Sequence, residues 1–525
     1  MAGWKTHFGR VCGTVAYALS MALGAAGQAQ LAPEANEFDW RFSVKPNQVV
    51  SSNITAENKC RRRNRFEVDT QHLPSFMRLV GDSGFSVESH KTHSLPVQFD
   101  STGLAAGKYE GEVVIRCVTC LQNGCEQDRQ LLHIFMTVEG GNAAQSFVPE
   151  RVLVLIPLDS PGNAEDNAKK LAGKHGIQMV EIHPLPSINA ALVVYALPAG
   201  ADVETKAAEL LPEVLLAQPD YLYRTSGNAG QEVESGSLKQ LQYGPKLIHA
   251  DHLRGVVTGK GVRVAIIDSG IDVNHPALQG KISEQYDATG KGFTPDIHGT
   301  LIAGIVLSEP RTSGGILGIS PGAEVVAIKA CHPETPQTIE AQCTSSTLAK
   351  AMEFAVQKRS RIINLSLTGP AEKLLRLLID AAVKLGIVVI AAAGNNGPRG
   401  QPSFPAALLN VIAVTAVDAN EQLYAEATQG DFISVAAPGV DIVSTSPGSK
   451  LMVSSGTSFA TAFVTGTAAL LLEQQSTLSP AQLKSVLEHS ARDLGPPGKD
   501  PQFGNGLVDA CRAVAQVRSD PQMCR

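Results

Sequence analysis

Three short segments, far apart in the chain, carry an acid, a base and a nucleophile. They are Asp268-Ser269-Gly270, His298-Gly299-Thr300 and Gly456-Thr457-Ser458-Phe459-Ala460. A serine hydroxyl is a poor nucleophile unless an imidazole takes its proton and a carboxylate orients that imidazole. The three segments therefore predict a hydrolytic centre in which Ser458 attacks, His298 transfers the proton and Asp268 orients His298.

Each of these residues also has an ordinary structural interpretation. Asp268 alone can form a turn with Ser269 and Gly270, and a serine that begins a helix is usually an N-cap. Asp268, however, follows the apolar run 262–267, and catalytic groups gather at the carboxyl ends of parallel strands. The combination of three such segments favours the chemical interpretation over three separate structural ones.

The charge that develops during acyl transfer needs hydrogen-bond donors. Ser458 begins an expected helix, 458–474, so its backbone N–H and the helix dipole favour negative charge nearby. Asn395 follows the expected strand 387–392 through Ala393 and Gly394, which places a side-chain amide at the same edge of the sheet. We expect Asn395 and the Ser458 N–H to form the oxyanion hole, while residues 395–397 also form a turn.

Size and composition indicate a folded protein with several domains. The chain has 525 residues, which is more than one hydrophobic core usually organises. Hydrophobic residues make up 43% and charged residues 18%, as in globular domains rather than disordered chains. The formal net charge of −6 offers no general attraction for nucleic acid or for an anionic membrane surface.

The first 29 residues have the pattern of a signal peptide. Lys5 and Arg10 precede the apolar run 11–27, and the small residues Gly27 and Ala29 flank an expected cut before Gln30. A membrane anchor is the alternative, but this run is short and rich in glycine and alanine. We expect a protein exported to the extracellular space or periplasm, without a membrane span.

Cysteine usage agrees with an oxidising compartment. Cys12 leaves with the signal peptide, and the even number that remains favours disulfides. Cys331–Cys343 and Cys511–Cys524 would each close a short local loop. A further four cysteines allow three pairings, between which the sequence does not choose: Cys60, Cys117, Cys120 and Cys125. Cys117-x-x-Cys120 also resembles half a zinc site or a redox pair, but no matching histidine or second such pair supports that alternative.

The region before the catalytic segments divides into two expected domains. Residues 30–143 contain alternating runs separated by Gly, Asn, Asp and Pro, which predicts an immunoglobulin-like β-sandwich. The basic run 59–65 inside it favours a solvated face rather than a binding site. Residues 144–225 follow a strand–helix–strand–strand–helix–strand order, which predicts a ferredoxin-like α+β fold.

The remainder of the chain has a different pattern. Residues 226–237 are rich in Gly, Ser, Asn and Glu and predict an exposed linker that proteases can cut. From 238 to 525, near-continuous apolar strands alternate with helices, which predicts a parallel α/β sheet flanked by helices. The expected strands are 262–267, 324–329, 361–366, 387–392 and 411–416.

With these residues identified, residues 242–514 resemble the catalytic domain of the subtilisin-like serine proteases, the subtilase family. The order Asp, His, Ser distinguishes this family from chymotrypsin-like and α/β-hydrolase enzymes. The resemblance extends to four further segments: INLSL at 363–367, AAAGN at 391–395, VAAPG at 435–439 and FGNGLV at 503–508. Residues 147–225 resemble the family's inhibitory propeptide, which assists folding and is then cut off.

The resemblance implies where a polypeptide substrate binds. A substrate strand would add to the segment Ser366, Leu367, Thr368 and Gly369, with Gly394 nearby, by β-augmentation. The last strand of the propeptide, 221–224, would occupy this cleft until the enzyme cuts its own chain within residues 224–241.

The chain departs from the family pattern at four positions. Ala462 replaces a proline four residues after the nucleophile, and Leu301 replaces a second histidine after His298. Ala277 replaces an aspartate that contributes to a calcium site, so that site is not predicted here. Thr368 stands where many relatives have glycine, which would narrow the cleft. No metal or other cofactor is required for the expected chemistry.

The sequence thus predicts a secreted, monomeric serine endopeptidase that is made as a zymogen and cleaves its own chain. Its expected partners are polypeptide substrates and its own propeptide. Two alternatives remain open from the residues. One is a catalytically silent subtilase-like protein in which the sandwich binds a partner. The other is an esterase or peptide ligase, because acyl chemistry is common to all three activities.

Overall fold

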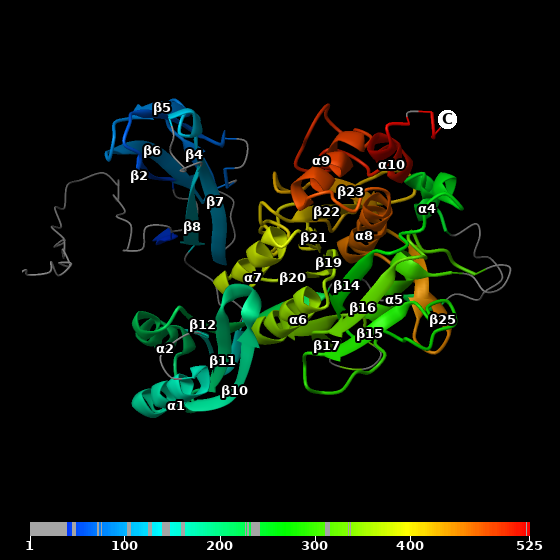
Figure 1. The fold of residues 1–525 in the computed structure, drawn as a ribbon, viewed down its shortest axis with the longest axis horizontal. Coiled ribbons are helices and arrows are strands. Elements are labelled where there is room, and N and C mark those ends of the chain that lie inside the picture. Colours follow the sequence, from blue (N-terminus) through cyan, green and yellow to red (C-terminus); the bar gives the residue numbers. More distant parts are fainter. Residues whose placement is uncertain are drawn as a thin grey trace, which may run out of the picture.

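The computed structural model describes residues 39–520 and 522–524, apart from 45–48, 71–72, 75, 102–106, 124–128, 139–146, 159–162, 226, 228–229, 233–241, 310–314, 334 and 336–337. The expected signal peptide, Cys125 and most of the expected linker therefore lie outside the described residues. Figure 1 shows three parts along the chain: a set of sheets at the N-terminus, a small α+β unit, and a larger α/β unit that carries the C-terminus.

The N-terminal part consists of two sheets that share one hydrophobic core. The larger has the order β1 (Asp39–Val44), β8 (Arg129–Val138), β7 (Gly107–Cys117), β3 (Asn64–Val68) and β5 (Gly84–Val87). The smaller has the order β2 (Val49–Glu57), β6 (Thr92–Asp100) and β4 (Met77–Leu79). In β2, buried and exposed positions alternate, as in a sheet that buries one face. Phe66 from one sheet and Phe99 from the other belong to the shared core.

The second part is a four-stranded antiparallel sheet with two helices. Its elements are β9 (Phe147–Pro157), α1 (Ala164–His175), β10 (Gln178–Leu185), β11 (Ala190–Ala196), α2 (Val203–Leu210) and β12 (Leu216–Thr225), and the strands lie in the order β10, β11, β9, β12. The helices begin where the sequence provides capping side chains: Asn163 accepts from the N–H of Asp166, and Asp202 accepts from that of Thr205. Alternate residues of β9 point to opposite faces, so Val154 packs with the helices and Leu155 packs with the third part.

The third part is built on a seven-stranded parallel sheet. The strand order is β15 (Ile282–Asp287), β16 (Glu324–Lys329), β14 (Arg263–Asp268), β19 (Ile362–Leu365), β21 (Val388–Ala392), β22 (Ile412–Val417) and β23 (Val435–Pro438). Helices α5 (Ile297–Leu307) and α8 (Thr457–Gln474) pack with one set of alternate strand residues, and α6 (Ser345–Gln357) and α7 (Lys373–Lys384) pack with the other. Burial on both faces explains why the strands are almost uniformly apolar.

Smaller elements complete this part. Strands β24 (Ile442–Ser446) and β25 (Lys450–Ser454) form a hairpin, to which β13 (Gln231–Glu232) adds a third strand. Strand β18 (Ala341–Thr344) pairs with β12 on one side and with β17 (Cys331–Pro333) on the other, and β20 (Leu367–Thr368) also pairs with β12. The short α4 (Gly244–Leu247), α9 (Pro480–Ser490) and α10 (Ala510–Arg518) follow on the outside. Among the described residues, no helix has the length and apolar character needed to cross a bilayer.

Three disulfides join described cysteines. Cys331 pairs with Cys343 and Cys511 pairs with Cys524, each closing a local loop, and Cys117 pairs with Cys120. Cys60 is also disulfide-bonded, and its Sγ lies 3.5 Å from that of Cys120. The first bridge joins residues that are opposite each other in the hairpin β17–β18.

A nearly buried charged cluster connects the N-terminal sheets to the third part. Glu112 on β7 and His133 on β8 are directly opposite each other in the sheet, and both contact Arg376 of α7. The Arg376 guanidinium lies 3.0 Å from the Glu112 carboxylate, and their side chains are only 11% and 12% exposed. Figure 1 shows β7 and β8 next to α7. This cluster joins the N-terminal sheets to α7 of the third part.

We expect Arg376→Ala to loosen the N-terminal sheets from α7. The variant removes the guanidinium partner of the Glu112 carboxylate, which is largely shielded from water. Small-angle X-ray scattering of the full chain should show a larger radius of gyration than that of the unsubstituted protein. Lys384→Ala, on an exposed position of the same helix, is the matched control and should leave the scattering unchanged. Identical curves for both variants would show that other contacts hold the sheets in place.

Candidate active site

Asp268 and His298 meet at the carboxyl edge of the parallel sheet. Asp268 is the last residue of β14, and His298 is the second residue of α5. The Nδ1 atom of His298 lies 2.8 Å from Oδ1 of Asp268, and both side chains are fully buried. A carboxylate only accepts hydrogen bonds, so in this contact Nδ1 carries the proton and Nε2 is the basic nitrogen of the neutral ring.

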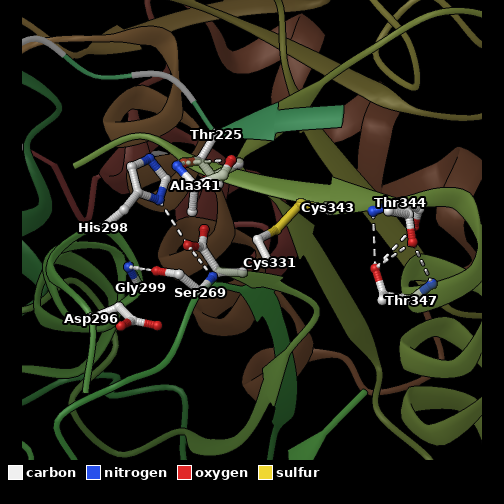
Figure 2. Close-up of a disulfide and its surroundings, with 12 residues drawn as sticks. Thr225, Ser269, Asp296, His298, Gly299, Cys331, Ala341, Cys343, Thr344 and Thr347 are labelled. Atoms are coloured by element: carbon white, nitrogen blue, oxygen red, sulfur yellow. Dashed lines mark hydrogen bonds and ion pairs between the residues drawn. A yellow bond between two sulfur atoms is a disulfide. The ribbon is translucent and has the colours of Figure 1, made fainter. Parts of the chain in front are cut away.

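The turns after Asp268 and His298 pass so close to other backbone atoms that Gly270 and Gly299 have no room for a side chain. A Cβ on Gly270 would collide with the carbonyl of Thr294, and one on Gly299 would lie 2.5 Å from the carbonyl of Ser269. The backbone N–H of Gly299 donates to Oγ of Ser269 at 3.0 Å, which ties the start of α5 to the end of β14 (Figure 2). The glycines after Asp268 and His298 are therefore required by close approach of the two segments.

A buried ion pair lies immediately behind this contact. Lys329, the last residue of β16, places its Nζ 2.7 Å from Oδ2 of Asp296, and both side chains are almost fully buried. The same carboxylate oxygen accepts from the backbone N–H of Gly270 at 2.8 Å. Asp296 thus connects the turn after Asp268 to the residues that precede His298. The sequence pattern did not reveal this pair, because its partners lie on separate strands and loops.

Ser458 lies at the start of α8 and faces the end of β19. Its side chain is fully buried, and its Oγ donates to the carbonyl of Ser366 at 3.0 Å. The Ser366 hydroxyl donates in return to the carbonyl of Ser458 at 3.0 Å. Within the described residues, Nε2 of His298 has no hydrogen-bond partner. The Ser458 hydroxyl therefore bonds to Ser366 rather than to His298 in this structure. Hydrogen bonds between catalytic groups often tighten only when substrate is bound.

Asn395 is held against the residue that precedes Ser458. Its Oδ1 accepts from the backbone N–H of Thr457 at 3.1 Å and from the Thr457 hydroxyl at 2.9 Å. The same hydroxyl accepts from the N–H of Gly394 at 3.1 Å, and a Cβ on Gly394 would collide with Ser403. Thr457 therefore orients the Asn395 amide relative to the nucleophile. Thr457 is part of the motif around Ser458, but the sequence alone did not reveal that its side chain contacts Asn395.

The segment 366–369 is paired with a strand of the same chain. Strand β12 runs antiparallel to β20, with Arg224 opposite Thr368 and Thr225 opposite Leu367. On its other edge it pairs with β18, where Arg224 is opposite Gln342. Thr368 keeps this pairing, so the threonine does not prevent a strand from entering the cleft.

Side chains of β12 also fill the cleft. The ring of Tyr223 lies against Gly369, where a Cβ would collide with it, and its hydroxyl donates to the carbonyl of Pro370 at 2.9 Å. Thr225 is fully buried, and its Oγ1 accepts from the N–H of Ala341 at 2.8 Å (Figure 2). The expected last strand of the second part, 221–224, therefore extends by one residue, and it lies where substrate is expected to bind.

Among the described residues, no group of three or more His, Cys, Asp or Glu side chains is arranged to hold a metal ion. What the site presents instead is a carboxylate, an imidazole, a hydroxyl and an amide at one sheet edge, beside a strand of polypeptide. This set is suited to acyl transfer on a peptide bond.

Comparison with known proteins indicates the same class of reaction, hydrolysis of peptide bonds. Residues 259–506 match the model of the subtilase family of peptidases. The chain is 31% identical over 398 residues to the thermophilic serine proteinase of Bacillus sp. (strain AK1), covering 75% of this chain and 93% of that protein. It is 35% identical over 277 residues to thermitase of Thermoactinomyces vulgaris, covering 52% of this chain and 95% of thermitase.

The chain belongs to the subtilase family. It is therefore a subtilisin-like serine endopeptidase. The fold also resembles the crystal structure of fervidolysin from Fervidobacterium pennivorans, with a TM-score of 0.61 at 22% identity, over 71% of this chain and 62% of that chain. The expected α/β class of the subtilase catalytic domain is thus confirmed.

Lys329→Met should destabilise the subtilase domain, because it leaves the buried Asp296 carboxylate without its partner. Breaking a buried pair in this way typically costs about 3–5 kcal/mol of unfolding free energy. Denaturant unfolding followed by circular dichroism would measure the change. Lys384→Met, at an exposed position, should change the unfolding free energy by less than about 0.5 kcal/mol. Equal stabilities for the two variants would contradict the assigned role of the pair.

Proposed function

We propose that the chain is an exported serine endopeptidase made as an inactive precursor, with Asp268, His298 and Ser458 as its catalytic residues. The observation that carries this proposal is the 2.8 Å contact between the buried His298 and Asp268 at the sheet edge where Ser458 also lies. Family membership supports the reaction class. The role of each residue is derived from its chemistry and position.

In the proposed mechanism, Ser458 Oγ rotates from the Ser366 carbonyl towards Nε2 of His298 and attacks the scissile carbonyl carbon. Nε2 takes the hydroxyl proton and then gives it to the leaving amine, so the C–N bond breaks and an acyl-enzyme remains. Water, deprotonated by the same nitrogen, releases the acyl group and restores Ser458. Asp268 holds Nδ1 and stabilises the transient imidazolium.

The developing oxyanion would be stabilised by the Ser458 backbone N–H and by Asn395. The bonds from Thr457 to Oδ1 of Asn395 support this role, because they commit the oxygen end of the amide and so determine which way its NH₂ end points. In subtilisin, a member of the same family, removing such a donor costs about 2.7–4 kcal/mol of transition-state stabilisation.

We further propose that residues 144–225 act as the inhibitory propeptide, preceded by the signal peptide 1–29 and an immunoglobulin-like domain over 30–143. Two observations support the inhibitory role. Strand β12 pairs with β18 and β20 and so occupies the cleft. In addition, Asp220 accepts from the N–H and the hydroxyl of Ser346 at 2.9 and 2.8 Å, and thereby caps α6 from outside the subtilase domain.

The strand register supports a proposal for where the precursor is cut. Arg224 is opposite Thr368 and Thr225 is opposite Leu367. The next residue of the cleft strand is Ser366, whose carbonyl contacts Ser458. Further along the chain from Thr225, a Cβ on Gly227 would lie 3.2 Å from the ring of Phe459, the residue after the nucleophile. We therefore propose that the bond after residue 226 is cut, within the range expected from the sequence and at the start of the linker 226–237.

Self-cleavage and the catalytic role of Ser458 can be tested together. Purified full chain should be cut to a product that begins at Gly227, and Ser458 should react covalently with a fluorophosphonate probe. Ser458→Ala should abolish both, because alanine lacks the oxygen that attacks. Ser485→Ala, which removes an exposed serine hydroxyl on α9, is the matched control and should keep both.

Trimming of the purified Ser458→Ala chain would exclude self-cleavage. An unlabelled wild-type chain without peptidase activity would instead favour a silent binding protein. A preference for ester over amide substrates in a competition assay would support esterase activity.

The stability of the precursor should depend on the titration of Asp220. Burial, the largest influence, raises the pKa of its carboxyl, against the hydrogen bonds from Ser346 and the charge of Arg151. Since the folded chain holds this proton more tightly than the unfolded chain, the stabilisation is complete below the ordinary carboxyl pKa of about 4. It is lost as the pH rises through the raised pKa.

The test compares two precursors that cannot cut themselves, the Ser458→Ala variant and the Ser458→Ala, Asp220→Asn double variant. Thermal unfolding of both is measured from about pH 4 to 7. Asparagine keeps an acceptor for Ser346 but does not titrate. The melting temperature of the precursor that keeps Asp220 should fall, relative to that of the Asp220→Asn precursor, as the pH rises. The melting temperature of the Asp220 precursor relative to the Asp220→Asn precursor could instead stay constant or rise with pH. That result would show that the hydrogen bonds from Ser346 and the charge of Arg151 outweigh the effect of burial on the pKa of Asp220.

A further inference from the structure

The chain that follows the proposed cleavage point forms a second strand pairing. Residues Gln231 and Glu232, which form β13, run antiparallel to β25, with Gln231 opposite Val453 and Glu232 opposite Met452. The Nζ atom of Lys450, also on β25, lies 2.6 Å from the Glu232 carboxylate. Strand β25 is held on its other edge by β24, over five paired positions.

This pairing is continuous with the active site. Strand β25 ends at Ser454, and α8, which carries the nucleophile, begins at Thr457. The same chain that pairs with β18 and β20 ahead of the nucleophile therefore pairs with β25 beyond it. Backbone pairing is thus described for residues 222–225 on one side of the nucleophile and for residues 231–232 on the other.

We propose that the edge of β25 on which β13 lies is a binding site for the part of a polypeptide substrate that follows the cleaved bond. Extended chain would add to β25 as β13 does, so that the fifth and sixth residues after the bond pair with Val453 and Met452. This inference rests on the proposed protease function and on cleavage after residue 226. The occupant is an extended polypeptide, because β13 itself shows what the edge accepts.

Two contacts give this site a preference among polypeptides. A Cβ on Gly230 would lie 2.5 Å from Sδ of Met452 and 2.8 Å from the carbonyl oxygen of Val453, so the fourth residue after the bond should be glycine. The pair between Lys450 and Glu232 favours an acidic sixth residue. Both of its side chains are more than half exposed, at 55% and 59%, so this preference should be small and sensitive to salt.

In the precursor the edge is occupied by the segment that becomes the new N-terminus after cleavage. That segment must leave β25 before a substrate can pair there. The pairing is short and ends in an exposed ion pair, so it is a contact that a longer substrate strand can replace. The same edge would then serve first the precursor's own chain and afterwards substrates in trans.

The test uses the processed enzyme and peptides taken from its own sequence. A peptide of residues 222–229 stops before the β25 contacts, and a peptide of residues 222–232 includes them. The longer peptide should show a kcat/KM about two- to tenfold higher, as expected for a few added hydrogen bonds. Valine in place of Gly230 in the longer peptide should remove this advantage.

A charge swap tests the register. Lysine in place of Glu232 in the longer peptide should lower kcat/KM about two- to fivefold at low salt, and Lys450→Glu enzyme should reverse this preference. Lys384→Glu, which changes a distant exposed lysine, should keep the wild-type preference. Equal kcat/KM for both peptide lengths would overturn the inference and leave β13 as an anchor for the linker only. Failure of both peptides to be cut, with no fluorophosphonate labelling, would instead contradict the proposed function.

Discussion

The contact between His298 and Asp268 imposes the strictest requirement on this fold. An imidazole can serve as a base for Ser458 only if its other nitrogen is committed as a donor, and a buried carboxylate provides that commitment. To bring the two groups within 2.8 Å, the end of β14 and the start of α5 must touch through their backbones. The glycines at 270 and 299 and the ion pair between Lys329 and Asp296 can all be understood as consequences of that approach.

The second constraint concerns β12, which belongs to two parts of the molecule at once. Strand β12 belongs to the small sheet on one edge and to the cleft on the other, and its polar residues Gln218 and Asp220 contact the starts of α7 and α6. These contacts place much of the binding outside the cleft, so cleavage of one bond does not by itself remove the strand. Under the proposed zymogen function, inhibition would therefore outlast cleavage until the contacts of Gln218 and Asp220 are also lost.

Much of the subtilase domain could be predicted because its signals are local. All five expected strands are present. Asp268 ends one of these strands and Asn395 follows another, while His298 and Ser458 begin helices, as the sequence predicted. Strand β15 was missed because it lies at the sheet edge, where exposed and partly buried residues alternate, and β23 because its short run ends at a proline. The bond from Ser458 to Ser366 could not be predicted, since a side-chain rotamer is not encoded in a motif.

Contacts between distant segments account for the rest. Nothing in the pattern around Gln231 indicates a strand, because two residues acquire that conformation only from their partner β25. In the same way, Arg376, Glu112 and His133 are unremarkable in their own segments and become a cluster only when β7, β8 and α7 meet. Arg376 also lines a small cavity with Tyr223 and Phe404. The N-terminal sheets therefore contact α7 next to the place where β12 inserts the ring of Tyr223. This gives those sheets a physical means of influencing how β12 is held.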